Sequence, residues 1–183
     1  MHWVHRSLRV LLPGAFLLGF SFWGPDPEWD SIRAYINENH PGVESVTPME
    51  LTEMLVEAQE SPVILDVREA TEFEVSHLAG AIRVKSPSEI AARLRAEFSK
   101  GGARPIVAYC SVGVRSARLV EQLNADGFED VFNLDGSIFS WANAGLPLVR
   151  GDEPTELVHP YNRSWGALLR PELWSWDASN ADR

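Results

Sequence analysis

The chain has 183 residues, which is enough for one domain of ordinary size with short extensions. Apolar residues make up 45% and charged residues 23%, values that are ordinary for a soluble globular protein and argue against disorder, collagen or a multi-span membrane protein. The net charge of −10 disfavours nonspecific binding to nucleic acid or to an anionic membrane surface, and the single cysteine excludes an internal disulfide, a Cys-x-x-Cys redox pair and a multi-thiolate metal site.

The N-terminal segment is typical of an export signal. Arg6 and Arg9 precede an uncharged, largely apolar run over 10–23, which is shorter than the roughly 20 residues of a bilayer span but suits the apolar region of a signal peptide. Small residues at the spacing that a signal peptidase prefers allow cleavage after Ser21. We therefore expect residues 1–24 to be a signal peptide or an uncleaved membrane anchor, and the protein to be periplasmic or otherwise exported.

A short helix is expected next. Asp26 is a typical N-cap and Pro27 a typical first helical residue, and His40-Pro41-Gly42 ends the pattern. Three apolar residues fall on one face of this helix: Trp29, Ile32 and Ile36. Residues 25–42 are therefore predicted to form a helical extension that packs on the following domain.

Between residues 43 and 149, short apolar runs alternate with helical periods. Strands are predicted at 63–65, 81–84, 105–109 and 131–134, and helices at 47–58, 86–98, 116–124 and 138–144. This alternation predicts an α/β fold, with a parallel sheet flanked by helices on both faces. In such sheets the ligand site lies beyond the carboxyl ends of the strands, where Asp66 and Cys110 are both found.

Charge is distributed unevenly along the chain. Residues 26–82 hold 13 acidic and two basic residues, whereas residues 83–118 hold two acidic and eight basic residues: Arg83, Lys85, Arg93, Arg95, Lys100, Arg104, Arg115 and Arg118. One interpretation is that Arg93, Arg95 and Lys100 form the solvated face of a helix. The other is a positive field around a site that takes a small anion.

The loop from Cys110 to Ser116 joins a strand end to a helix start. Gly113 permits a tight turn in which backbone N–H groups point inward as an anion-binding nest, and the helix N-terminus and Arg115 add positive charge. These features would lower the pKa of Cys110 and favour the nucleophilic thiolate. The alternative is a cysteine that is simply buried at a strand end.

The segment after Arg150 has a different composition. It contains three prolines and three tryptophans, Trp165, Trp174 and Trp176, without a sustained period. Because aromatic side chains are seldom left in water, we expect residues 150–183 to form a Trp-rich tail that wraps the domain. A partner-binding or membrane-facing segment is the alternative.

Several motifs together resemble a single rhodanese domain over residues 43–149. The resemblance rests on Leu65-Asp66-Val67-Arg68 with Glu72-Phe73, on His77-Leu78-Ala79-Gly80-Ala81, on the loop from Cys110 to Ser116, and on the segment from Gly127-Phe128 to Trp141. The chain departs from the family pattern at Ser76 and Ser137, where that family usually has glycine. Neither departure lies in the cysteine loop.

The resemblance implies a rhodanese-like α/β fold and a two-step sulfur transfer without a metal or an organic cofactor. Cys110 would attack a small anionic sulfur donor such as thiosulfate and become a persulfide. An acceptor, which could be a thiol, a cyanide-like molecule or a protein, would then remove the outer sulfur. Arg115 would bind the donor and stabilise the thiolate, while Asp66 and Arg68 support the architecture. The substrate-binding positions implied are Ser111, Val112, Gly113, Val114 and Ser116.

Two other functions remain open at this stage. Cysteine phosphatases and arsenate reductases of this fold resemble a longer Cys-x5-Arg loop, whereas the spacing here is Cys110-x4-Arg115, which suits a single sulfur atom. The second alternative is a catalytically inert, rhodanese-like binding module. The apolar Val112 and Val114 and an exported lone thiol favour this alternative.

Overall fold

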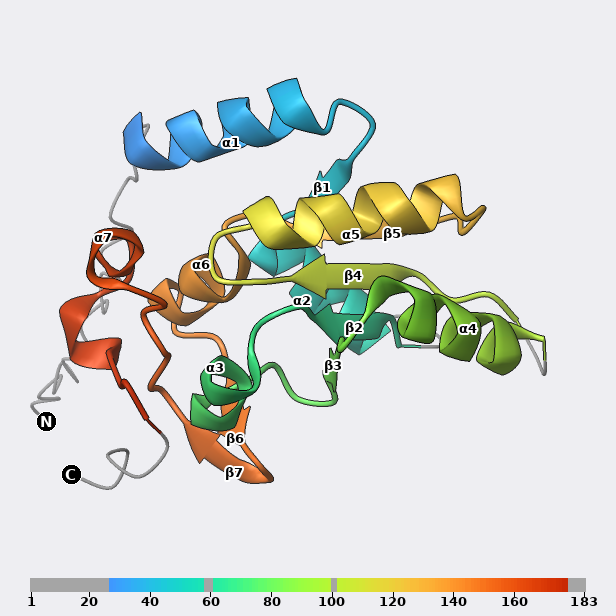
Figure 1. Ribbon diagram of the computed structural model, residues 1–183. Coiled ribbons are helices and arrows are strands. Elements are labelled where there is room, and N and C mark those ends of the chain that lie inside the picture. Colours follow the sequence, from blue (N-terminus) through green and yellow to red (C-terminus); the bar gives the residue numbers. More distant parts are fainter. Residues whose placement is uncertain (1–26, 58–60, 100–101, 178–183) are drawn as a thin grey trace, which may run out of the picture.

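The computed structural model describes residues 27–57, 61–99 and 102–177 (Figure 1). The expected signal or anchor at 1–24, the expected N-cap Asp26, and Lys100 lie outside these residues. Within the described ranges, no helix has the length and apolar character needed to cross a membrane.

Five parallel strands form the central sheet in the order β1-β5-β4-β2-β3. Their bounds are β1 Glu44–Val46, β2 Val63–Asp66, β3 Ile82–Arg83, β4 Ile106–Tyr109 and β5 Val131–Leu134. Asp66 at the end of β2 is paired in register with Tyr109 at the end of β4. The residues that follow these two strands therefore emerge side by side at one edge of the sheet, as the sequence predicted for Asp66 and Cys110.

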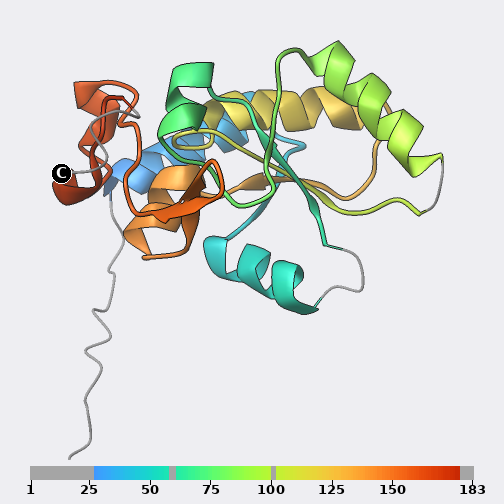
Figure 2. The same cartoon turned by 90° about the horizontal axis from the view of Figure 1, so that it is seen from below.

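Helices cover both faces of the sheet, which confirms the predicted α/β fold (Figure 2). Buried residues of α4 (Pro87–Phe98) and α5 (Val114–Ala125) pack against Leu65 and Ala108. Ile64 and Val107, which alternate with them along the strands, face α2 (Pro48–Glu57) and α6 (Ser137–Asn143). This period of two is what a sheet buried on both sides requires.

The element boundaries differ from the sequence prediction in informative ways. Helix α5 begins at Val114 rather than residue 116, because Gly113 adopts φ +109° and acts as its N-cap. The second predicted strand is reduced to the two residues of β3. Four short elements before the tail helices were missed: β1, α3 (Ala70–Val75), β6 (Leu148–Arg150) and β7 (Glu153–Thr155), the last two of which form a hairpin. With three to six residues each, they are too short to produce a readable period.

The two extensions pack on the domain from opposite ends of the chain. The expected helix before the domain is present as α1 (Pro27–Asn39), with Trp29, Ile32 and Ile36 buried. Arg33 of this helix forms an ion pair with Asp135 at 2.9 Å.

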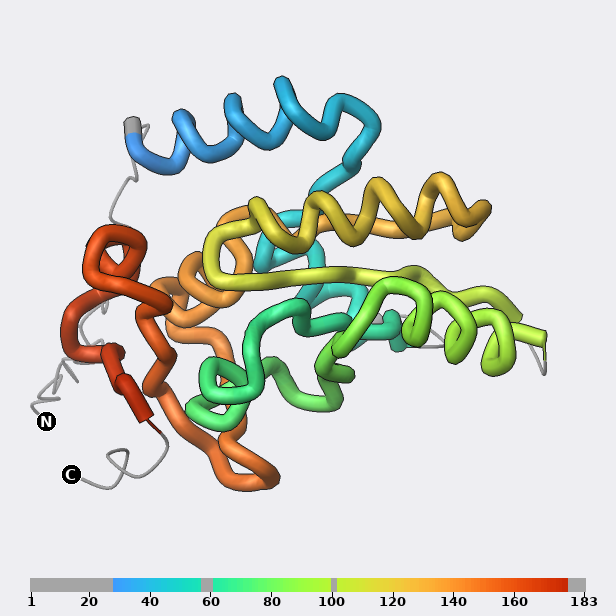
Figure 3. Tube along the Cα trace, in the orientation of Figure 1, coloured from blue at the N-terminus to red at the C-terminus, as the bar shows by residue number. Residues whose placement is uncertain are grey.

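The Trp-rich tail contains α7 (Arg163–Gly166) and the 3-10 helix η1 (Pro171–Leu173). Its residues Val158, Leu169 and Leu173 are buried in the same core as α6. Figure 3 shows the tail, in red, at the end of the molecule where α1 begins and where the loop before α5 turns.

Candidate active site

Cys110 follows β4 and is buried, with 1% of its surface exposed. Its backbone N–H donates to the Ser137 hydroxyl at 3.0 Å, and its carbonyl accepts the N–H of Ile138 at 3.2 Å. The next carbonyl, that of Ser111, accepts the N–H of Phe139 at 3.2 Å. The first turn of α6 therefore holds the start of the cysteine loop in place.

Gly113 gives the loop its inward turn. At φ +109° its N–H donates to the Cys110 sulfur at 3.1 Å. The backbone angle favours glycine, and a Cβ at this position would also be crowded, at 3.2 Å from Ile36 Cδ1 and 3.3 Å from Asn133 Nδ2. Asn133 also accepts the hydroxyl of Ser116 at 2.6 Å, which fixes the first turn of α5.

Arg115 is already engaged by a buried carboxylate. Its two terminal nitrogens donate to the two oxygens of Glu72 at 2.9 and 2.8 Å, and one of them also donates to the Ser111 hydroxyl at 2.9 Å. Ser111 in turn donates to Glu72 at 3.0 Å. The site thus contains a closed network of one cation, one carboxylate and one hydroxyl, which fixes the direction of Arg115.

Sequence reasoning quoted Glu72 within a motif but gave it no role. The carboxylate lies in α3, a helix that the sequence analysis did not predict, and it also accepts the backbone N–H of Glu69 at 3.0 Å. Two observations could have pointed to Glu72. A partly buried arginine needs an anionic partner, and the segment after β2, which carries Glu72, begins at the same end of the sheet as the helix that carries Arg115.

The electrostatics of this network favour the thiolate of Cys110. Burial is the largest influence and raises the pKa of the thiol, but the charge of Arg115 and the N–H groups of Ser116 and Gly113 together outweigh it, so the pKa is lowered. The position at the N-terminus of α5 acts in the same direction. Burial likewise raises the pKa of Glu72, and its bonds with Arg115 bring that pKa below the ordinary value.

Asp66 and Arg68 form a second, fully buried ion pair behind the loop. Their closest atoms are 2.6 Å apart, and Arg68 also donates to the Ser76 carbonyl at 2.6 Å. The guanidinium lies 5.5 Å from the ring centroid of Tyr109, whose hydroxyl accepts the N–H of Leu78 at 3.1 Å. These contacts join the loop after β2 to the segment around residue 77.

The two departures from the family pattern have different structural consequences. Ser76 has φ −169°, an extended conformation open to any residue. Ser137 has φ +51°, a left-handed conformation that favours glycine. Its hydroxyl accepts the Cys110 N–H and donates to the Leu134 carbonyl at 3.3 Å, so this serine makes bonds that glycine could not. The sequence analysis missed this contact.

A pocket of about 190 Å³ lies directly over the cysteine. It is lined by Cys110, Ser111, Val112, Val114 and Arg115 from the loop, and by Tyr161 and Trp165 from the tail. The Arg115 guanidinium stacks 4.7 Å from the ring centroid of Tyr161. The sequence analysis expected the tail to wrap the domain, but did not expect it to form one wall of the site.

Most of the predicted site residues line this pocket or hold it together. Gly113 and Ser116 do not line the pocket but support the loop, Gly113 by its bond to the Cys110 sulfur and Ser116 by its bond to Asn133. Asp66 and Arg68 also lie outside the pocket.

The described cations of the basic third are found in several places. Arg93 and Arg95 are exposed on α4, as expected for a solvated face. Arg104 pairs with Glu97. Arg83, Lys85 and Arg118 line a separate depression of about 320 Å³, which shares Arg115 with the cysteine pocket but does not include Cys110.

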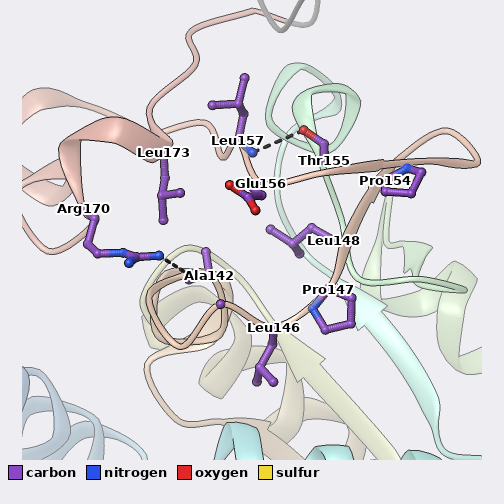
Figure 4. Close-up of a pocket in the computed structure, with 11 residues that line it drawn as sticks. Ala142, Leu146, Pro147, Leu148, Pro154, Thr155, Glu156, Leu157, Arg170 and Leu173 are labelled. Atoms are coloured by element: carbon purple, nitrogen blue, oxygen red, sulfur yellow. Dashed lines mark hydrogen bonds between the residues drawn. The ribbon is translucent and has the colours of Figure 1, made fainter. Parts of the chain in front are cut away.

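A larger pocket lies away from the cysteine. Figure 4 shows it between the end of α6, the β6–β7 hairpin and η1, with a volume of about 610 Å³. Leucine and proline side chains dominate its wall, with Arg170 and Glu156 as its charged members. It contains none of the predicted site residues. Across the described ranges, no group of three or more histidine, cysteine, aspartate or glutamate side chains is placed to hold a metal ion.

Comparison with known proteins gives a consistent result. The family model for the Rhodanese-like domain matches residues 47–144, inside the predicted 43–149. The uncharacterized protein YibN of Escherichia coli K12 is 33% identical over 109 residues, covering 60% of this chain and 74% of YibN. The thiosulfate sulfurtransferase GlpE of Haemophilus influenzae is 30% identical over 103 residues, covering 56% of this chain and 91% of GlpE.

Among solved structures, the thiosulfate sulfurtransferase of Pseudomonas aeruginosa superposes with a TM-score of 0.55. It is 21% identical, and the match covers 68% of this chain and 23% of that chain. At this identity the likeness concerns the fold alone.

Proposed function

The chain belongs to the rhodanese-like domain family, and from that premise we propose that it is a sulfurtransferase that carries sulfur on Cys110 as a persulfide. The observation that carries the proposal is the buried Cys110 sulfur, which accepts the Gly113 N–H at 3.1 Å on the floor of a pocket. The lowered pKa of this thiol supports the same role, because the thiolate is the nucleophilic form. A relative named as a thiosulfate sulfurtransferase supports the reaction class.

The transfer has two steps. The Cys110 thiolate attacks the outer sulfur of a donor, a bond forms between the two sulfur atoms, and the donor's own sulfur–sulfur bond breaks as its remainder leaves with the electron pair. An acceptor thiolate or cyanide then attacks the outer sulfur of the persulfide, and Cys110 leaves as the thiolate. The Gly113 N–H, with other N–H groups of the loop, stabilises the negative sulfur in both states.

Arg115 acts in this proposal mainly through its charge. Because both terminal nitrogens are bound to Glu72, the guanidinium is oriented beside the sulfur rather than left open for an incoming anion. Of the two roles that the family resemblance implies for Arg115, this geometry supports stabilisation of the thiolate rather than direct binding of the donor. Glu72 becomes a positioning residue for Arg115.

Residues 1–24 are proposed to export the protein or to anchor it to a membrane, which would place the sulfur transfer in the periplasm or another exported compartment. The support is the pattern of two arginines followed by a short apolar run. Fractionation of cells that express the full chain, followed by N-terminal sequencing, distinguishes a cleaved signal from an anchor. Recovery of intact chain from the cytoplasm alone would contradict export.

The persulfide itself is tested by intact mass. The full chain is treated with thiosulfate and, separately, with an organic thiosulfonate, and the Cys110→Ser variant is treated in parallel. We expect a gain of one sulfur atom that cyanide reverses and that the variant lacks. If a protein with a demonstrably free thiol gains no sulfur from either donor, the proposed activity is wrong.

A further inference from the structure

The pocket over Cys110 is apolar where the donor's leaving group must lie. When the outer sulfur of a donor meets the Cys110 sulfur, the rest of the donor occupies the 190 Å³ above it. Val112, Val114, Tyr161 and Trp165 contribute the larger part of that wall. A leaving group that carries oxyanions would lose water against these side chains.

The charges that line the pocket are already compensated. Arg115 is its only cation, and it is bound to both oxygens of Glu72 and stacked on Tyr161. The other cations near the site, Arg83, Lys85 and Arg118, line the separate depression that shares Arg115 with this pocket but does not include Cys110. A sulfite-like leaving group would therefore find no unpaired positive charge inside this pocket.

Apolar surface continues outward from the cysteine past Trp165. This tryptophan also lines a shallow pocket of about 350 Å³ with Val114, Ile32 and Tyr35. It lines a third pocket, of about 480 Å³, with Ile32 and Leu168, where Glu28, Ser31 and Ser164 add polar groups at the rim. Trp165 is 36% exposed and Tyr35 52% exposed. Apolar surface that is continuous and exposed beside a reactive group is typical of a ligand-binding groove.

Tyr161 is held in a strained conformation at the mouth of the pocket. Its φ of +62° lies in the left-handed region, which bulky residues seldom adopt. Its N–H donates to His159 Nδ1 at 3.0 Å, and its ring receives the Arg115 guanidinium. Strain of this kind concentrates at functional sites because the surrounding contacts keep the side chain where it is needed.

We propose that Tyr161 and Trp165 select sulfur donors whose leaving group carries an apolar substituent, namely aromatic or alkyl persulfides and thiosulfonates, over inorganic thiosulfate. The proposal rests on the sulfurtransferase function given above. With a thiosulfonate, the Cys110 thiolate bonds to the terminal sulfur, the donor's sulfur–sulfur bond breaks, and an organic sulfinate leaves with the electron pair. With a persulfide, an organic thiolate leaves in the same way, and neither step requires an oxidant.

The test compares benzenethiosulfonate with thiosulfate as donors for the full chain, with cyanide as the common acceptor. Both donors present a terminal sulfur bonded to an oxidised sulfur, and they differ in a phenyl group in place of one oxyanion. We expect kcat/KM to favour benzenethiosulfonate by about 10- to 200-fold, the range for an apolar group in a hydrophobic pocket. Trp165→Ala should reduce that preference about tenfold by lowering kcat/KM for benzenethiosulfonate alone.

Two further variants make the test specific. Tyr161→Asn removes the ring while asparagine tolerates the left-handed backbone, so it too should reduce the preference without unfolding the tail. Trp176→Ala is the matched control, because Trp176 is an exposed tail tryptophan that contacts Trp174 and His159 and does not line the pocket. It should leave the ratio of the two kcat/KM values unchanged.

The outcomes separate this inference from the proposed function. Equal kcat/KM values, or a preference for thiosulfate, would overturn the donor assignment and leave the sulfurtransferase intact. A Trp165→Ala variant that lowers both values equally would also overturn it, since the tail would then only shield the sulfur. Absence of a persulfide with either donor, in protein whose thiol is free, would instead refute the sulfurtransferase itself.

Discussion

The cysteine loop and the Trp-rich tail form opposite walls of one pocket, but they are held in different ways. Hydrogen bonds hold most residues of the loop, through contacts with α6, Glu72 and Asn133, and most of the loop is buried. The tail faces it with two partly exposed aromatic rings, Tyr161 before the four-residue helix α7 and Trp165 on that helix. A wall of directed bonds can fix a reacting atom, whereas an aromatic wall can only favour one kind of neighbour over another.

This contrast coincides with the extent of the family match. The loop lies within residues 47–144, and both Tyr161 and Trp165 lie after them. Helix α1 also lies outside the family match, before its first residue, and its Ile36 side chain lies next to Gly113. The loop that we propose carries the chemistry thus lies within the family match, while the aromatic wall of its pocket lies outside that match.

Gly113→Ala should have the largest effect, because it disrupts the bonded wall directly. The new Cβ meets Ile36 and Asn133, and φ +109° is strained for alanine, so the N–H that reaches the sulfur must move. Loss of one such donor costs on the order of 100-fold in rate. The measurement is kcat/KM for persulfide transfer.

Gly127→Ala is the matched control for that experiment. Gly127 also has positive φ, +86°, but no atom lies within 4 Å of its added Cβ. Strain of about 1–2 kcal/mol should therefore lower the stability without changing the activity. If both variants lose activity to the same extent, the special role assigned to the Gly113 N–H is wrong.

Removing the ion pair between Glu72 and Arg115 should raise the pKa of Cys110. In the double variant Glu72→Gln with Arg115→Gln, no charge is left unpaired, yet the cation that lowers the thiol pKa is gone and burial then dominates. We expect alkylation of Cys110 by iodoacetamide to slow at neutral pH, because a smaller fraction of the thiol is ionised. The inflection in the pH dependence of the alkylation rate should move to higher pH. If it does not move, the backbone N–H groups alone lower the pKa of Cys110.

Glu72→Gln alone should change how stability depends on pH. The pKa of Glu72 is lowered in the folded protein, so its ion pair stabilises the fold above the ordinary carboxyl pKa, and this stability is lost as the pH falls through the lowered value. The variant should be less stable by about 2 kcal/mol at neutral pH. Urea unfolding at neutral and acidic pH should show this difference shrinking in acid, and a constant difference would contradict the linkage.

The smallest expected effect concerns the tail. Trp165→Ala should speed alkylation of Cys110 by a few-fold, because the wall over the sulfur is opened, while the inflection of its pH profile stays in place. Tail and loop would then be separable, one governing access and the other the pKa. A shifted inflection would show that the tail also tunes the thiol.

The parts of the site that the sequence revealed are those whose geometry is local. A strand end, a glycine and an arginine within six residues are enough to predict the loop from Cys110 to Arg115, since a turn into a helix N-terminus follows from the residue types. The supporting role of Asp66 and Arg68 could be predicted for the same reason, because the two residues lie two positions apart and form an ion pair with each other. Alternating apolar runs likewise predicted the sheet and most of its helices.

The features of the site that the sequence did not predict depend on contacts between segments that are distant in the chain. Glu72 and Arg115 are 43 residues apart, and Cys110 and Ser137 are 27 apart. The tail residues Tyr161 and Trp165 reach the pocket only because Leu169 and Leu173 are buried in the core, which no local period signals. Such partnerships require the folded arrangement, because side-chain pairing across a chain is not encoded in spacing.

The aromatic wall has one more consequence, which follows from its place in the sequence. Trp165 and Tyr161 come after the whole cysteine loop, so a chain cut between the domain and Tyr161 would keep Cys110 but lose this wall of the pocket. Cleavage in the tail would therefore leave the thiol more accessible to oxidants.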